Sequence, residues 1–188
     1  MSRVILGVDP GLTRCGVAVV RANDRRKVEL VHVDTLKTSA DVELSERLLD
    51  IGARIEKLIL EHKPNQIAIE RVFAQANVRS VMGVAQISGV VLYLAKKHGV
   101  AIQMHTPSEV KAAVTGSGRA EKAQIGSAVA KILGLSSIPK PADSADAIAI
   151  AICNAWKTGL PNSAKSTKTS AQEAWIAAER VASRKPRA

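Results

Sequence analysis

The sequence predicts one α/β domain over residues 1–157, with helices flanking a mixed β-sheet, and a basic tail over residues 158–188. Three observations lead to this prediction. Short apolar runs bounded by turn residues fill the first part of the chain, helical and strand-like periods then alternate, and the composition changes near residue 158. The 188 residues can bury one substantial core but cannot supply two large lobes.

Three antiparallel strands are expected at the start of the chain. Residues 4–8 form a buried apolar run, which Asp9-Pro10-Gly11 brings to an end. Residues 15–20 predict a second strand, paired with the first as a hairpin. Residues 28–36 predict a third strand after a polar turn.

Beyond the third strand, helical and strand-like segments alternate. Apolar residues between 44 and 59 recur on one helical face, and a short buried strand follows over 66–70. The remaining expected elements are a helix over 77–98, a strand over 100–105, a helix opened by Pro107, and helices over 120–133 and 142–156. This order predicts a five-stranded sheet in which three antiparallel strands are followed by parallel strands.

The charge balance favours an anionic partner. Lys and Arg number 27 against 17 Asp and Glu, a net charge of +10, which favours nucleic acid first and a membrane surface second. We expect a cytoplasmic protein without a membrane span, because the chain starts directly in a strand and its longest uncharged stretch is too short to cross a bilayer. Cys15 and Cys153 lie in apolar runs and are expected to be buried, reduced thiols.

The tail over residues 158–188 has a different composition from the domain. Six basic residues stand against two acidic ones, among many Ser, Thr, Ala and Pro residues. This composition predicts a mostly disordered segment. It could serve as an electrostatic arm for DNA or only as a solubilising tail, and the sequence leaves both open.

Two acidic residues stand where buried strands are predicted to end. Asp9 closes the first strand and Glu70 closes the strand over 66–70. A charged residue in such a position is unfavourable unless it has a partner or a task. Because ligand sites in α/β sheets commonly lie at the carboxyl ends of strands, we expect the two carboxylates to share one rim.

A second pair of acids opens the last predicted helix. Asp143 and Asp146 are three residues apart and therefore lie on one helical face, in the first turn after Pro139 and Pro141. They could be a helix cap and a surface acid, since the helix dipole favours anions there. The segment after Asp146 is almost wholly apolar, however, which favours ligands over surface decoration.

Four carboxylates without a metal-spaced His or Cys cluster favour a hard cation. Mg²⁺ prefers oxygen ligands, and two such ions are the usual device for phosphodiester hydrolysis, with Mn²⁺ as a substitute. Together with the basic charge balance, this donor set predicts a nuclease.

Aromatic and basic residues near these acids suggest contacts with DNA. Phe73 lies three residues after Glu70 in a polar loop, where it could stack on an unpaired base or simply pack under the loop. Lys111 and Lys122 flank a Gly-containing loop with Arg119 between them, a pattern that suits phosphate contacts but is common in plain turns. His105 closes the fifth strand and could lie near the site.

The helix over 77–98 suggests a subunit interface. Its segment 81–95 contains no charge, and a helix that is apolar all round is buried on both sides. In a small domain this favours a two-fold homodimer, with Val81, Val84 and Ser88 as interface residues. A central core helix is the alternative.

Four segments together closely resemble the RuvC family of Holliday junction resolvases. They are GVDPGLTRCG at 7–16, IERVF at 69–73, TPSEVK at 106–111 and ADSADA at 142–147. The resemblance covers about residues 3–157 and keeps the order and spacing of the segments. It implies a ribonuclease-H-like fold, a homodimer, and paired symmetric nicks across a four-way DNA junction.

The resemblance also assigns roles to residues. It implies that Asp9, Glu70, Asp143 and Asp146 are the metal-binding catalytic acids. It implies that Phe73 is the wedge at the junction core, that Lys111 and Lys122 contact DNA, and that RuvA and RuvB are partners in branch migration.

Three other readings compete with this one. A phosphotransferase of the actin–hexokinase type shares the Asp-Gly-Thr turn but needs a second lobe that this chain cannot supply. A ribonuclease-H-like enzyme acting on ribosomal RNA would not need the uncharged helix over 77–98 or Phe73. A DNA-binding module without catalysis would not need four convergent carboxylates.

Overall fold

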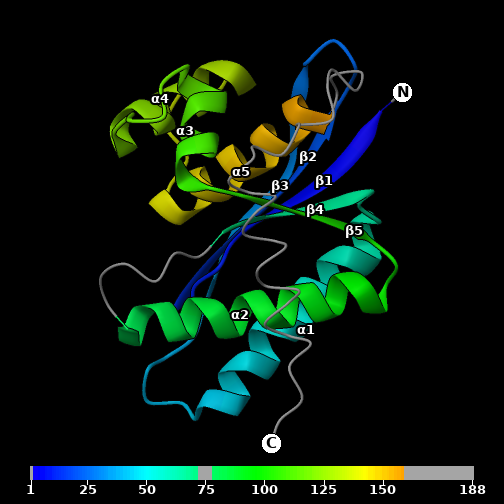
Figure 1. Cartoon of the computed structure of the whole chain (residues 1–188), viewed down its shortest axis with the longest axis vertical. Helices are drawn as coiled ribbons and strands as arrows, with labels where there is room; N and C mark the ends of the chain where they lie inside the picture. Colours follow the sequence, from blue (N-terminus) through cyan, green and yellow to red (C-terminus); the bar gives the residue numbers. More distant parts are fainter. Residues whose placement is uncertain (1, 72–77, 159–188) are drawn as a thin grey trace, which may run out of the picture.

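The computed structural model of the chain describes residues 2–71 and 78–158, which form five strands and five helices around one sheet (Figure 1). The strands are β1 (Arg3–Asp9), β2 (Arg14–Ala22), β3 (Val28–Lys37), β4 (Gln66–Glu70) and β5 (Ala101–His105). The helices are α1 (Leu44–His62), α2 (Val78–Lys97), α3 (Pro107–Thr115), α4 (Lys122–Leu133) and α5 (Ala142–Thr158). Phe73 and the predicted tail beyond Thr158 lie outside the described residues.

The sheet has the predicted mixed topology. Its strand order is β3-β2-β1-β4-β5. β1 and β2 pair antiparallel, as do β2 and β3, whereas β4 pairs parallel with both β1 and β5. The parallel order brings the carboxyl ends of β1, β4 and β5 to the same edge, where the predicted acids of β1 and β4 stand.

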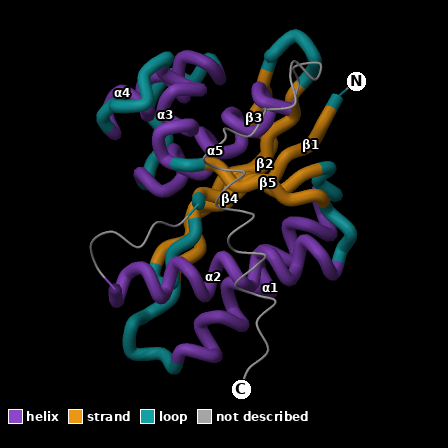
Figure 2. The backbone as a smooth tube through the Cα atoms, in the orientation of Figure 1, coloured by secondary structure: helices purple, strands orange, loops and turns teal. Residues whose placement is uncertain are grey.

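The helices cover both faces of the sheet, which gives three layers (Figure 2). On one face, α1 and α2 pack on strand residues such as Leu6, Val8 and Ile67. On the other face, α3, α4 and α5 pack on residues such as Ile5 and Ala68. The alternation of the two sets along β1 and β4 is the two-residue period of a strand with both faces buried.

α5 lies close against the sheet because two glycines leave room for it. A Cβ on Gly7 would stand 2.3 Å from the Ala147 carbonyl oxygen, and one on Gly16 would stand 2.2 Å from that of Asp143. Larger residues at these positions would push the helix away. The glycines of β1 and β2 therefore determine the distance between the first turns of α5 and the sheet.

The expected element boundaries hold closely. α1 extends to His62 and ends where Lys63 adopts a left-handed conformation, with φ of 45°, directly before Pro64. Pro107 is at the start of α3, in a capping box formed by Thr106 and Glu109. Both cysteines are buried with free thiols. Within residues 2–71 and 78–158, none of the helices is both long and apolar enough to cross a membrane.

Candidate functional site

The carboxylates of β1 and β4 meet at one edge of the sheet. Val8 pairs with Ile69, so the next residues, Asp9 and Glu70, end neighbouring parallel strands. The two-residue period places both of them on the face that α5 covers, together with Gly7 and Ala68. The shared rim predicted for these two acids is therefore present.

The first turns of α5 lie above this edge. Asp143 and Asp146 are both partly buried there, and the rest of the helix from Ala147 to Ala155 is buried. The hydroxyls of Thr35 and Ser144, both buried, lie 3.1 Å apart and tie the start of α5 to β3. The sheet and the helix thus hold four acidic residues near one another.

Three of the four predicted acids line one pocket of about 240 Å³. These are Asp9, Glu70 and Asp146, and two predicted DNA-binding residues, Lys111 of α3 and Lys122 of α4, line it with them. Its apolar walls are formed by Pro107, Val110, Ile125 and Ile150. Arg119 lies elsewhere, in a wide groove along α3 and α4 that Thr115, Ser117, Gln124 and Ser127 also line.

The crowding of negative charge perturbs the protonation of the pocket. Burial, followed by the carboxylates of Asp146, Glu70 and Asp143, raises the pKa of Asp9 to about 7, and Lys122 opposes this rise. The pKa of Glu70 is raised by burial first and by Asp146 second. Such a site favours whatever reduces its negative charge, either a proton or a cation.

Both acids of α5 have a cationic partner from the chain itself. The Nε and Nη2 atoms of Arg14 each lie 2.7 Å from Oδ2 of Asp143. The Lys122 ammonium lies 3.5 Å from Oδ2 of Asp146. No pattern in the sequence singles out Arg14, although this residue begins β2, the strand after the Asp9 turn, and therefore stands at the same edge of the sheet.

A buried arginine braces the turn that connects Asp9 with Arg14. Arg47 of α1 is 9% exposed and donates through Nε to the Thr38 hydroxyl and through Nη2 to the Thr13 hydroxyl, both at 2.9 Å. The Thr38 amide in turn donates to the Thr13 carbonyl at 3.1 Å. This network holds the backbone between the two site residues.

His105 is near the site but points away from the pocket. It is the register partner of Glu70, is 4% exposed, and lies 2.9 Å through Nε2 from Oδ1 of Asn154 on α5. Asn154 donates to the Gln66 side chain at 2.8 Å. His105 therefore belongs to a buried polar network that ties α5 to β4 and β5.

The donor set of the pocket suits a hard cation. Carboxylate oxygens are the preferred ligands of Mg²⁺ in proteins, and such a cation would relieve both the burial and the carboxylate repulsion that raise the pKa of Asp9. With the side chains placed as they are, no group of three or more His, Cys, Asp or Glu residues in the described parts of the chain is arranged to hold a metal ion.

One predicted interface residue on α2 needs correction. Ser88 is 5% exposed and its hydroxyl donates to the Val84 carbonyl at 2.8 Å, so its side chain belongs to the interior of the subunit. The helical phase places Ile87, Ser88, Val91, Leu94 and Ala95 on the buried side. Val81 and Val84 are partly exposed. The outward face instead carries Met82, Ala85, Gly89, Leu92 and Tyr93.

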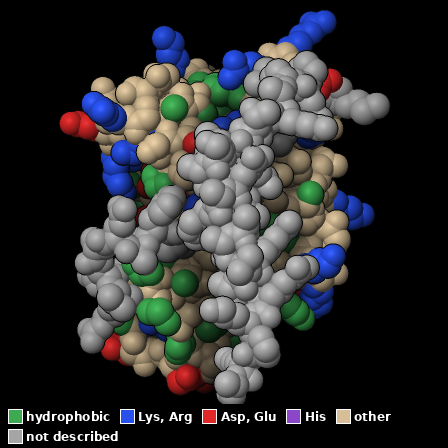
Figure 3. Space-filling view, in the orientation of Figure 1, with side chains coloured by type: hydrophobic (Ala, Val, Ile, Leu, Met, Phe, Trp, Pro, Cys, Tyr) green, Lys and Arg blue, Asp and Glu red, His purple; other side chains and the backbone are tan. Residues whose placement is uncertain are grey.

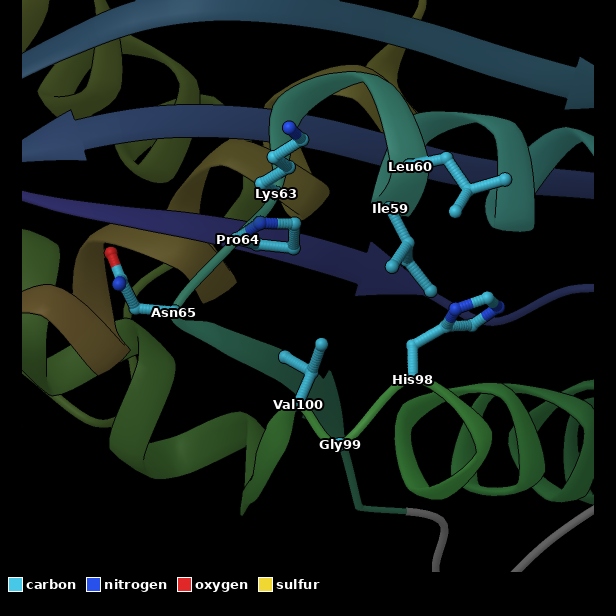
Figure 4. A pocket seen from close by; sticks show the side chains of 8 residues that line it. All are labelled: Ile59, Leu60, Lys63, Pro64, Asn65, His98, Gly99 and Val100. Atoms are coloured by element: carbon cyan, nitrogen blue, oxygen red, sulfur yellow. The ribbon is translucent and has the colours of Figure 1, made fainter.

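A pocket of about 370 Å³ at the opposite end of the sheet is a poor alternative site (Figure 4). Ile59, Leu60, Pro64 and Val100 form its apolar part, and none of the residues lining it is acidic. Two of its polar side chains, His98 and Asn65, already have structural partners. Nε2 of His98 lies 2.6 Å from the Glu56 carboxylate, and Asn65 accepts a hydrogen bond of 2.7 Å from the Val4 amide.

Comparisons with known proteins agree on one family. The family model described as "Crossover junction endodeoxyribonuclease RuvC" matches residues 5–154. The crossover junction endodeoxyribonuclease RuvC of Clavibacter michiganensis subsp. michiganensis is 50% identical over 195 residues, covering 94% of this chain and 96% of the relative. That of Paenarthrobacter aurescens is 50% identical over 188 residues, covering 98% of this chain and all of the relative.

Solved structures agree in fold. RuvC of T. thermophilus in complex with a Holliday junction substrate superimposes with a TM-score of 0.80 at 34% identity, covering 84% of this chain and 95% of that one. The yeast mitochondrial Holliday junction resolvase Ydc2 has a TM-score of 0.59 at 15% identity, covering 82% of this chain and 79% of that one. The fold is therefore ribonuclease-H-like, as the sequence predicts.

Proposed function

Because the chain belongs to the RuvC family of crossover junction endodeoxyribonucleases, we propose that it resolves four-way (Holliday) DNA junctions by paired symmetric nicks, in recombination and repair. One observation carries the proposal: three carboxylates and two lysines line one pocket at the carboxyl ends of parallel strands. Phosphodiester hydrolysis by metal ions needs oxygen ligands for the cations and positive charge for the DNA backbone, and this pocket offers both.

The proposed cofactor is Mg²⁺, two ions in each site, with Mn²⁺ as a substitute. Asp9, Glu70, Asp143 and Asp146 would hold it. Burial first and the neighbouring carboxylates second raise the pKa of Asp9 to about 7, and this supports the assignment, since a divalent cation relieves the repulsion among the carboxylates. When bound, the ions would supply an activated water and stabilise the leaving 3′ oxygen.

The basic residues of α3 and α4 would hold the DNA backbone over the acids. Lys111 and Lys122 line the pocket, and each would neutralise a phosphate of the strand to be cut. Arg119, in the groove along the same two helices, would contact a phosphate further along the DNA. The apolar wall of Val110, Ile125 and Ile150 would limit the access of water to the reacting phosphate.

Phe73 would act as a wedge in the junction core. The proposal rests on its position in the sequence, three residues after Glu70 in a polar segment, and on the resemblance of this segment to the family motif. Bases at a junction centre are partly unpaired, so an aromatic ring can insert there more easily than in a continuous duplex.

A homodimer would supply the two nicks. Apolar side chains reach the surface over α2 in the lower half of Figure 3. On the outward face of α2, Met82 is 54% exposed, Leu92 39% and Tyr93 64%. We propose that this face, flanked by Val81 and Val84, packs on its own copy about a two-fold axis. We also propose the RuvA and RuvB branch-migration proteins as partners. The proposed location of the protein is the cytoplasm.

Cleavage of a synthetic four-way junction with and without Mg²⁺ tests the function. Wild type should make paired nicks only with the metal. Asp9→Asn and Asp146→Asn should abolish cleavage while junction binding survives, because ligands are lost and the basic surface is kept. Glu29→Gln, which removes an exposed acid of β3, is the matched control and should cut normally. Cleavage by Asp9→Asn at a rate near that of the wild type would contradict the proposed metal site.

A further inference from the structure

Arg14 and Asp143 form an ion pair at the rim of the pocket. Both donors of the guanidinium, Nε and Nη2, reach the same oxygen of Asp143, Oδ2, at 2.7 Å. The side chain of Arg14 is 48% exposed, and that of Asp143 is 26% exposed. Arg14 therefore presents part of its charge to solvent while holding one of the four acids proposed as metal ligands.

This pair separates Asp143 from the other three acids. Asp9, Glu70 and Asp146 line the pocket, whereas Asp143 does not. Its carboxylate still contributes to the raised pKa of Asp9, after burial, Asp146 and Glu70, and it would have to move to join the other three acids in the pocket.

The backbone of Asp143 cannot supply this movement. Its carbonyl lies so close to β2 that a Cβ on Gly16 would stand 2.2 Å away, and the neighbouring Ser144 is held by Thr35. Rotation of the Asp143 side chain remains, and that rotation breaks both contacts with Arg14.

We propose that Arg14 is a metal-released ligand for DNA phosphate. Arg14 pairs with Asp143 until a divalent cation takes this carboxylate, and the freed guanidinium then binds a backbone phosphate beside the pocket. The proposal rests on the metal site proposed above and adds to it a DNA contact that forms only after the cation has bound. It makes the binding of metal and the binding of DNA reinforce each other.

We expect both steps of this exchange to be favourable, the transfer of Asp143 to the cation and the transfer of Arg14 to a phosphate. A half-exposed ion pair is a weak interaction, so a divalent cation with further carboxylate ligands competes well for Asp143. A guanidinium released at a solvent-facing edge is suited to phosphate, which it can bind through two donors. Because linkage is reciprocal, a metal that frees Arg14 for DNA must itself bind more tightly in the presence of DNA.

The first test needs no metal and no cleavage. Asp143→Asn frees Arg14 permanently, so this variant should bind a four-way junction more tightly than wild type in EDTA. Its log–log salt slope should be larger in magnitude by about one unit. Arg14→Gln combined with Asp143→Asn should lose that extra unit. Arg21→Gln combined with Asp143→Asn is the matched control and should keep it, because Arg21 lies on the same strand, is 50% exposed and pairs with Glu29.

The second test uses the cation. Mg²⁺ titrated into free protein and followed by calorimetry should bind Arg14→Gln about threefold to tenfold more tightly than wild type, because a competing positive charge is gone. With Ca²⁺ in place of Mg²⁺, and the junction verified as uncut on a denaturing gel, Arg14→Gln should bind junction more weakly than wild type. In EDTA, Arg14→Gln combined with Asp143→Asn should bind the junction like wild type, because the charges at these two positions sum to zero in both proteins.

The outcomes separate this inference from the proposed function. Asp143→Asn could lose Mg²⁺ binding and yet show the same salt slope with and without Arg14. This result would support the metal site and overturn the role of Arg14. Weaker Mg²⁺ binding by Arg14→Gln would also overturn it and would make Arg14 a residue that positions Asp143. Unchanged Mg²⁺ binding by Asp143→Asn would instead remove Asp143 from the proposed ligands.

Discussion

The surroundings of Asp9, an acid at the end of a strand, strongly change its pKa. Burial and three neighbouring carboxylates raise its pKa to about 7, whereas an Asp in an unfolded chain titrates near 3.9. Between these pH values the folded protein holds a proton that the unfolded chain releases. The contribution of Asp9 to the stability of the metal-free protein should therefore fall as the pH rises from about 4 to about 7.

The variant Asp9→Asn removes this titration and tests it. At pH 8 and without metal, Asp9→Asn should be more stable than wild type by roughly 2–4 kcal/mol, and the difference should vanish near pH 4. Mg²⁺ at about 100 times its dissociation constant should stabilise wild type by about 2.7 kcal/mol and Asp9→Asn far less. Urea unfolding at several pH values measures both effects. A stability difference that does not change with pH would show that folding does not raise the pKa of Asp9.

Residue types and spacing singled out the four acids and the two lysines of the pocket as candidates, but they did not indicate the ion-pair partners of these residues. The pair of Arg14 with Asp143 joins residues that are 129 positions apart, and no local pattern indicates it. The orientation of Ser88 also escaped prediction, because a helix without charge in the segment 81–95 gives no sign of which side faces the core. Contacts between residues far apart in the sequence determine both the Arg14–Asp143 pair and the orientation of Ser88.

At the scale of elements, the contact of α5 with the sheet places two of the acids. The sequence allowed the strands and helices to be predicted nearly to the residue, because Asp, Pro and Gly residues end the apolar runs sharply. It did not indicate that Gly7 and Gly16 serve close approach. Glycine in a strand has several uses, and only the position of α5 distinguishes them.

Gly7→Ala tests this contact. The added methyl would stand 2.3 Å from the Ala147 carbonyl oxygen, a backbone atom that cannot move alone, so α5 must shift. We expect a loss of about 1–3 kcal/mol in unfolding free energy and reduced cleavage, because Asp146 moves with the helix. Gly52→Ala is the control, since its methyl meets only the end of the Val90 side chain, at 3.1 Å. Equal losses in both variants would show that the close approach of α5 has no special effect.

At the scale of the whole molecule, the acids and the apolar surface belong to different layers. The carboxylates lie on the face of the sheet that α5 covers, whereas the exposed apolar face of α2 lies on the other side. A dimer built on α2 would therefore leave each pocket open to DNA. Two copies about one axis would present two pockets to a substrate that itself has two-fold symmetry, which is what paired nicks require.

Tyr93→Glu tests the dimer. Tyr93 is 64% exposed on α2, so a charge there should leave the subunit folded but would be buried without a partner in the dimer. We expect the dimer to weaken by about 2 kcal/mol or more, which is roughly a thirtyfold rise in the dissociation constant.

Leu49→Glu makes the same change of charge at a residue of α1 that is 72% exposed, and it should remain a dimer. Sedimentation velocity measures both, and junction cleavage should change in step. Tyr93→Glu should cut the two strands in separate, uncoupled events, while Leu49→Glu should still cut them together. A wild-type protein that sediments as a monomer at micromolar concentration would exclude the α2 interface.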